Sequence, residues 1–160
     1  MKRAFLTLTA LVLGTVLSVN AATPRPAPDI RWGTAKGSTL RSFRGQPVVL
    51  LVSPSSSDKK VRAQVKRIWE YYRQLSERNL VVIGAFTRNP GLVKSNVPVA
   101  IAPDGAKIAQ SLGVNPDEFT IVVIGKDGNM DLISDKVQAG QRLLDILINS
   151  YVPQSEQQRN

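Results

Sequence analysis

Three uninterrupted apolar runs along the chain predict the strands of a sheet. They span residues 47–52, 80–86 and 119–124 and are rich in β-branched side chains. A strand that is covered on both faces is apolar at every position, so the first run indicates a central strand, usually in a parallel sheet, and the other two runs indicate further strands. A helix between the first two runs would complete a β-α-β unit with a right-handed crossover.

Residues 58–78 predict that helix, because apolar side chains recur there at helical spacing. The apolar stripe consists of Val61, Val65, Ile68, Trp69, Tyr72 and Leu75. We therefore expect Trp69 and Tyr72 to belong to the core. Tyr71 is then the aromatic side chain that is left to meet a ligand.

The second half of the chain predicts shorter elements. After a turn at residues 88–91, an apolar piece at residues 97–102 leads to a helix near residues 106–112. Lys126-Asp127-Gly128-Asn129 is typical of a hairpin turn, so the third apolar run should pair with an antiparallel strand at Met130 to Ile133. Residues 139–151 predict the last helix.

The first residues have the three-part pattern of a secretory signal peptide. Lys2 and Arg3 precede a stretch that is uncharged to Val19, and small residues suit a cleavage site after Ala21. We expect residues 1–21 to be removed on export to the periplasm or the medium, which leaves no transmembrane segment. The alternative is an uncleaved membrane anchor.

The remaining chain divides into three parts. Residues 22–28 alternate proline with other residues and predict an extended spacer. Residues 29–152 form one folded domain, which opens with a short edge strand at Ile30 to Trp32. Residues 153–160 are a polar tail.

The composition excludes several classes of catalytic and metal-binding chemistry. The 160 residues include 21 Lys and Arg against 12 Asp and Glu, a net charge of +9, and neither Cys nor His. Disulfides, dithiol redox couples, Cys/His zinc sites and Ser-His-Asp catalysis are therefore excluded. Three aspartates near the hairpin, Asp127, Asp131 and Asp135, fit no calcium-loop pattern. We expect no metal and no cofactor.

Three segments resemble motifs of the thioredoxin-like superfamily. They are LRSFRGQPVVL from Leu40, VPVAIAPDG from Val97 with a following helix that ends in LGV, and FTIVVIGKDG from Phe119. Their order is similar to that of the peroxiredoxin and TlpA-like branch, and to small exported thioredoxin-like domains of unknown function. The resemblance implies a three-layer α/β/α sandwich with a mixed sheet, a central parallel β-α-β unit and a C-terminal hairpin plus helix.

The chain departs from that superfamily at the reactive centre. The resemblance places the catalytic C-x-x-C where the first core strand meets its helix, and this sequence has Asp58-Lys59-Lys60-Val61, or Ser55 to Asp58 in a looser register. Phe119 stands where the superfamily has a cis-proline. Dithiol exchange and cysteine-based peroxide reduction are thus excluded. The candidate binding residues at this corner are Ser55, Ser56, Ser57, Asp58, Lys59, Lys60, Phe119 and Thr120. The alternative for the serines and Asp58 is a loop and a helix cap.

The predicted helix at residues 58–78 is strongly basic. Its candidate anion-binding residues are Arg62, Lys66, Arg67 and Arg73. Such a face suits nucleic acid, an anionic envelope component or an acidic protein, and the alternative is a solvated outer face.

The function that we expect is an exported thioredoxin-like domain without redox activity, which binds a protein or an anionic partner. Two alternatives stay open. One is a basic binder of nucleic acid or cell-envelope anions through the helix at residues 58–78. The other is an enzyme that uses serine, aspartate or lysine chemistry at the degenerate corner.

Overall fold

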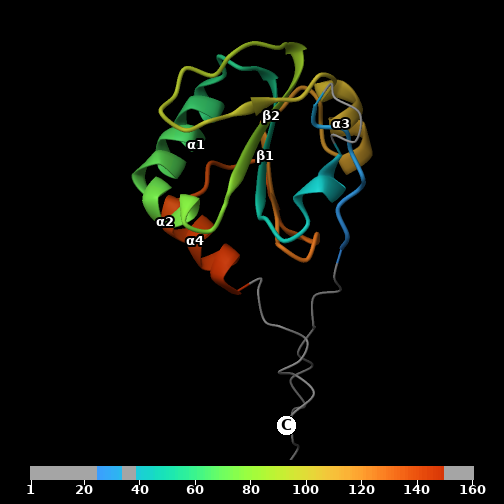
Figure 1. Ribbon diagram of the computed structural model, residues 1–160. Helices are drawn as coiled ribbons and strands as arrows, with labels where there is room; N and C mark the ends of the chain where they lie inside the picture. The colour runs from blue at the N-terminus through green and yellow to red at the C-terminus, as the bar shows by residue number, and fades with distance from the viewer. Residues whose placement is uncertain (1–24, 34–38, 150–160) are drawn as a thin grey trace, which may run out of the picture.

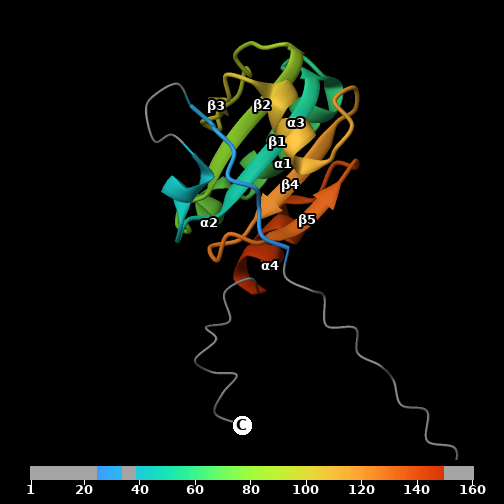
Figure 2. The ribbon, with the colours of Figure 1, turned by 90° about the vertical axis from the view of Figure 1, so that its right-hand side faces the viewer.

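The computed structural model describes residues 25–33 and 39–149, in which five strands form one mixed sheet of order β3-β2-β1-β4-β5 (Figure 2). β1 lies parallel to β2 and antiparallel to β4. β3 extends the parallel side, and β5 forms a hairpin with β4. The strands are β1 (Val48–Ser55), β2 (Val81–Asn89), β3 (Ala100–Ile101), β4 (Thr120–Ile124) and β5 (Met130–Ser134).

Helices cover both faces of this sheet. In Figure 1, α1, α2 and α4 lie on one side of it, and α3 lies on the other with a short 3-10 helix, η1. The helices are η1 (Leu40–Phe43), α1 (Lys59–Glu70), α2 (Tyr72–Ser76), α3 (Gly105–Leu112) and α4 (Gly140–Asn149). The expected three-layer α/β/α architecture is therefore confirmed.

The apolar run of β1 is continuous because it supplies two cores. Val49 and Leu51 pack with the helices α1 and α4, whereas Val48, Leu50 and Val52 pack with α3. All five side chains are at most 1% exposed. Successive side chains of a strand point to opposite faces. In a strand between two helical layers, every side chain therefore faces an apolar core.

β1 and β2 continue beyond their apolar runs. They pair as far as Ser55 and Asn89, with a register shift between Ser53 and Ser55 at Pro54, which has no backbone N–H to donate. The turn expected at residues 88–91 therefore begins later than the sequence predicts. Backbone pairing needs no apolar side chains, and the apolar pattern could not reveal this extension.

The helix expected over residues 58–78 is two helices, with a break at Tyr71. Tyr71 has φ −120° and ψ 15°, and its N–H donates to the Ile68 carbonyl, three residues back. A β-carbon at Gly140 would collide with the Tyr71 ring and the Arg67 carbonyl, so the ring lies directly against the start of α4. Tyr71 is thus packed against the core, contrary to the expectation that it is free to meet a ligand.

The expectation that Trp69 belongs to the core is also wrong. Its side chain is 48% exposed, and it stacks on Tyr72 with ring centroids 5.7 Å apart and planes 26° from parallel. Tyr72 is partly buried against the core, as expected. Trp69 precedes the break and lies on the same face of α1 as Arg62 and Lys66, which is turned to solvent, whereas Tyr71 turns at the break toward the core.

The described N-terminal segment packs on the domain without adding a strand to the sheet. The N–H of Ala27 donates to the Gly128 carbonyl at 2.9 Å, and that of Met130 donates to the Arg25 carbonyl at 2.8 Å. The edge strand expected at Ile30 to Trp32 is only an isolated bridge between Arg31 and Thr39. Arg25 and Ala27 thus contact the hairpin between β4 and β5.

Parts of the predicted domain organisation lie outside the described residues. These are the signal peptide at residues 1–21, the first residues of the spacer, the last residues of the domain and the tail at residues 153–160. No helix of residues 25–33 and 39–149 has the length and apolar composition that crossing a membrane requires.

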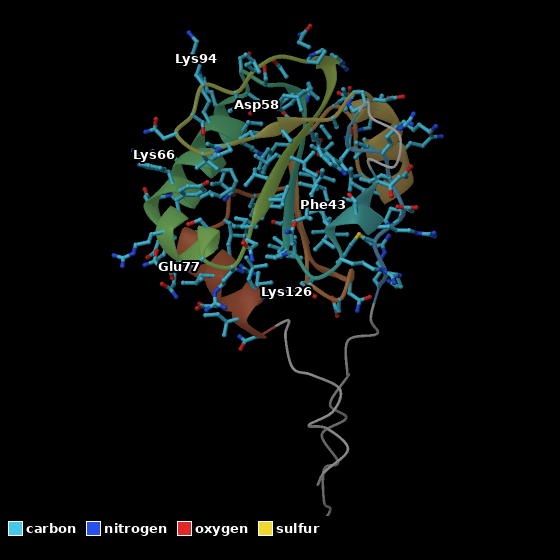
Figure 3. All side chains as sticks on the ribbon, in the orientation of Figure 1. Phe43, Asp58, Lys66, Glu77, Lys94 and Lys126 are labelled. Carbon is cyan, nitrogen blue, oxygen red and sulfur yellow. The ribbon has the colours of Figure 1, made fainter. Side chains whose placement is uncertain are left out.

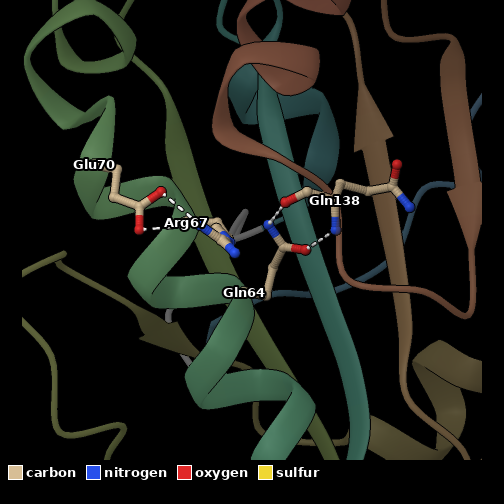
Figure 4. Close-up of polar contacts among 4 residues, drawn as sticks. All are labelled: Gln64, Arg67, Glu70 and Gln138. Atoms are coloured by element: carbon tan, nitrogen blue, oxygen red, sulfur yellow. Dashed lines mark hydrogen bonds and ion pairs between the residues drawn. The ribbon is translucent and has the colours of Figure 1, made fainter.

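A buried amide joins α1 to the segment that leads into α4 (Figure 4). The Gln64 side chain donates to the Gln138 carbonyl at 3.1 Å and accepts from the Gln138 N–H at 2.6 Å. Gln64 is 0% exposed and Gln138 is 6% exposed. One side chain therefore satisfies two buried backbone groups that lie outside any helix or strand.

We predict that Gln64→Leu lowers the free energy of unfolding by about 2–6 kcal/mol. The change puts an apolar side chain of similar size in place of the amide and leaves a buried N–H and a buried carbonyl unpaired, each of which costs about 1–3 kcal/mol. Urea denaturation measures the loss. Gln110→Leu, at an exposed position of α3, is the matched control and should change the stability by less than about 0.5 kcal/mol. Equal losses in the two variants would contradict the prediction.

Candidate functional site

Most polar groups at the corner between β1 and α1 are hydrogen-bonded to one another. The hydroxyls of Ser55 and Ser57 lie 2.9 Å apart, and the Ser57 N–H donates to the Ser55 hydroxyl at 3.2 Å. The Asp58 carboxylate accepts from the Lys60 N–H at 2.6 Å and caps α1. A cap of this kind contributes about 1 kcal/mol to stability, so these groups have a structural task.

Other segments cover the rest of this corner. The Ser56 N–H donates to the Asn89 carbonyl at 3.4 Å, and a β-carbon at Gly91 would lie 2.9 Å from the Ser56 hydroxyl. The Lys60 ammonium donates to the Asp135 carbonyl at 3.1 Å, which ties the first turn of α1 to the segment after β5. Lys59 is exposed. Five of the six residues from Ser55 to Lys60 thus form turns, a cap or ties between elements.

Phe119 and Thr120 lie beneath this corner and are buried. Phe119 is 2% exposed and belongs to the core cluster that α1 covers. Thr120 is 7% exposed and pairs with Val52 of β1. No peptide bond of the described residues is cis. Phe119 therefore fills the core at the position where the resemblance would have placed a cis-proline.

The four predicted anion-binding residues fall into two pairs with different surroundings. Arg67 lies 3.1 Å from Glu70 (Figure 4), and Arg73 lies 3.5 Å from Glu77. Both arginines are thus partly neutralised by carboxylates of their own helix or turn. In the part of the chain that the structure describes, no carboxylate forms an ion pair with Arg62 or Lys66.

Arg62 and Lys66 border a surface hollow that the sequence did not predict. Together with Trp69, they occupy positions i, i+4 and i+7 of α1 and share one face of the helix. The connection between β2 and β3 forms the opposite wall, and the space between them is about 190 Å³. We call it the Trp69 hollow; it is lined by Arg62, Val65, Lys66, Trp69, Lys94, Ser95 and Asn96.

Lys94 adds a third cation to this hollow from a distant part of the chain. Figure 3 shows Lys94 and Lys66 at the same outer side of the molecule. Among the described residues, Lys94 forms no ion pair, whereas the Ser95 hydroxyl is held by the backbone of Val97 at 2.8 Å. The connection has no periodic pattern, and only the fold brings it to α1. For that reason sequence analysis missed Lys94 and Asn96.

The aspartates near the hairpin show no metal-binding arrangement within the described ranges. The Asp127 carboxylate accepts from the backbone N–H of Asn129 at 3.0 Å and from its side chain at 2.7 Å, which stabilises the turn. Across residues 25–33 and 39–149, no three acidic side chains come close enough together to hold a metal ion.

Comparison with known proteins identifies one family model. The model for a domain of unknown function (DUF4174) matches residues 39–147 of the chain. No curated protein matches the chain.

Solved structures with a similar chain path include a thiol:disulfide interchange protein, a thiol-disulfide isomerase and a peroxidoxin. A thiol:disulfide interchange protein of the thioredoxin family from Chlorobium tepidum TLS has 15% identity and a TM-score of 0.60, over 81% of this chain and 97% of that chain. A secreted thiol-disulfide isomerase from Corynebacterium glutamicum has 18% identity and a TM-score of 0.60, over 78% and 84%. Peroxidoxin BcpB from Mycobacterium tuberculosis has 14% identity and a TM-score of 0.56, over 81% and 98%.

These similarities establish the fold of the chain. It is thioredoxin-like, as the sequence resemblance implied, and it lacks cysteine entirely. At identities below 20%, a shared fold does not carry a shared activity.

Proposed function

The chain belongs to the family described as a domain of unknown function (DUF4174), and from this premise we propose that it is an exported, non-redox domain that binds an anionic partner. The observation that carries the proposal is the charge arrangement at the Trp69 hollow. Arg62, Lys66 and Lys94 border it from two elements, and none of them has a carboxylate partner among the described residues.

The non-redox part of the proposal follows from the missing atoms. Thiol-disulfide exchange proceeds by attack of a thiolate on a disulfide sulfur, and cysteine peroxide reduction also begins with a thiolate. The 160 residues contain no cysteine, and their only sulfur atoms are those of two methionines. The corner that the resemblance identifies as the reactive centre holds serines that form a turn and an aspartate that caps α1.

The binding part rests on unbalanced positive charge. The net charge of the chain is +9, and it is +7 once Lys2 and Arg3 are removed with residues 1–21. Such a charge attracts anions from a distance, and cations without carboxylate partners determine where the anions bind. An exposed ion pair contributes only about 0.2–1 kcal/mol, so a useful affinity requires several contacts at once. Three cations around one hollow offer such contacts, whereas Arg67 and Arg73 already have partners.

The export part rests on the N-terminal pattern of residues 1–21. An exported domain without disulfides depends on packing alone for its stability. Two apolar cores, one on each face of the sheet, are consistent with that requirement.

We predict that the purified protein does not accelerate the reduction of insulin by dithiothreitol, because it has no thiol to form a mixed disulfide. Turbidity of the precipitating insulin B chain measures the rate, with a cysteine-containing thioredoxin as the positive control. Acceleration above the protein-free rate would refute the non-redox proposal.

We predict that replacing both Arg62 and Lys66 by glutamate weakens binding to a phosphocellulose column about tenfold at low salt, because each reversal removes an attraction and adds a repulsion. A salt gradient measures elution. The matched control replaces Arg44 and Lys107 by glutamate, which changes the net charge equally but at η1 and α3, across the sheet. Elution of both variants at the same salt concentration would mean that charge alone, without a site, controls retention.

We predict that the chain recovered from the periplasm or the medium begins at Ala22. Intact-mass measurement of protein expressed in a Gram-negative host distinguishes cleavage after Ala21 from retention of the leader. A full-length chain in the membrane fraction would favour the anchor instead.

A further inference from the structure

We propose that the Trp69 hollow binds an acidic polysaccharide, with one sugar ring against the indole and its acidic groups at the surrounding cations. This inference rests on the proposed function and names the class of its partner. Four features of the hollow support it: the held indole, its single ring position, the Asn96 amide and the placement of the charges.

The indole of Trp69 is exposed but held in place. It is 48% exposed, and it is supported from one side by its stack on Tyr72, which itself packs against the core. An indole fixed in this way can accept a flat ligand without first being ordered, so less free energy is lost on binding. The electron-rich ring face attracts the C–H groups on one side of a pyranose ring, as it attracts the edge of another aromatic ring.

The hollow offers a single stacking position. Tyr72 is engaged with Trp69, and Tyr71 is turned against Gly140, so neither continues a row of exposed rings along α1. Single-stranded nucleic acids are bound by successive aromatic platforms that stack one base after another. One ring position in a space of about 190 Å³ therefore favours a single sugar ring of a chain over a run of bases.

The wall opposite the indole suits a ligand with hydroxyl groups. Asn96 lines the hollow, and no hydrogen bond of its side-chain amide is found among the described residues. An amide both donates and accepts, and so does a sugar hydroxyl. An acidic peptide would meet the cations equally well, and its backbone could pair with the amide, but its acidic side chains carry no ring to stack on the indole.

The cations lie on two walls of the hollow. Arg62 and Lys66 project from α1, and Lys94 comes from the connection between β2 and β3. A chain whose successive rings each carry an acidic group can place charges near both walls at once. A ligand with one acidic group can reach only part of this arrangement.

The test is isothermal titration of the full chain with hexagalacturonate, a chain of six sugar rings with a carboxylate on each. The comparison ligands are hexaglutamate, which has the same charge without rings, and a six-nucleotide single strand of DNA. We expect hexagalacturonate to bind at least about tenfold more tightly than either, and Trp69→Ala to reduce that affinity about tenfold. Trp69→Phe retains a ring and should restore most of the loss.

Lys94→Glu gives a second measurement outside the helix. It should also weaken hexagalacturonate binding, whereas Lys107→Glu on α3 should leave it unchanged. Circular dichroism and urea denaturation confirm that each variant is folded. Trp69 and Lys94 are exposed, so neither change removes a buried core side chain.

Three results would overturn the inference: equal affinity for hexaglutamate, tighter binding of the DNA strand, or unchanged hexagalacturonate binding by Trp69→Ala. In each of them the proposed function survives if the double reversal of Arg62 and Lys66 still weakens retention on phosphocellulose. If that double variant is retained like the control variant, the anion-binding proposal fails together with the inference.

Discussion

The position of α1 on the sheet depends on one buried amide. Gln64 holds both backbone groups of Gln138, a residue 74 positions later, and so connects the first helix to the segment that starts the last one. An amide with two opposed hydrogen bonds permits little rotation of the helix about its axis. The face that carries Gln64 is therefore turned inward, and the face with Arg62, Lys66 and Trp69 is turned outward.

The central strands could be predicted from the sequence because a strand that is buried on both faces is apolar at nearly every position. The runs at residues 47–52 and 119–124 are apolar at nearly every position, and both became central strands. The orientation of Tyr71 was not predictable in the same way. Its ring lies at the break between α1 and α2 and packs against Gly140, a glycine far along the chain that allows the ring to approach.

The candidate site was predictable only in part, for a similar reason. Basic residues of the helix could be read from the sequence, but which of them are neutralised depends on side-chain geometry. Glu70 pairs with Arg67 and Glu77 pairs with Arg73. Of the four predicted residues, Arg62 and Lys66 are therefore the two without a carboxylate partner among the described residues. Lys94 lies in an aperiodic connection, and no local pattern relates it to α1. Only the assembled fold brings the three cations together.

The contacts of Arg25 and Ala27 place the described N-terminal segment at the hairpin end of the domain. These residues hydrogen-bond to Met130 and Gly128, beside the turn that contains Lys126, and Figure 3 shows Lys126 and Lys94 at opposite ends of the domain. If residues 1–21 were retained as the alternative membrane anchor, the domain would thus be held by its hairpin end. Lys94, which lines the Trp69 hollow, would then lie at the end of the domain away from that anchor.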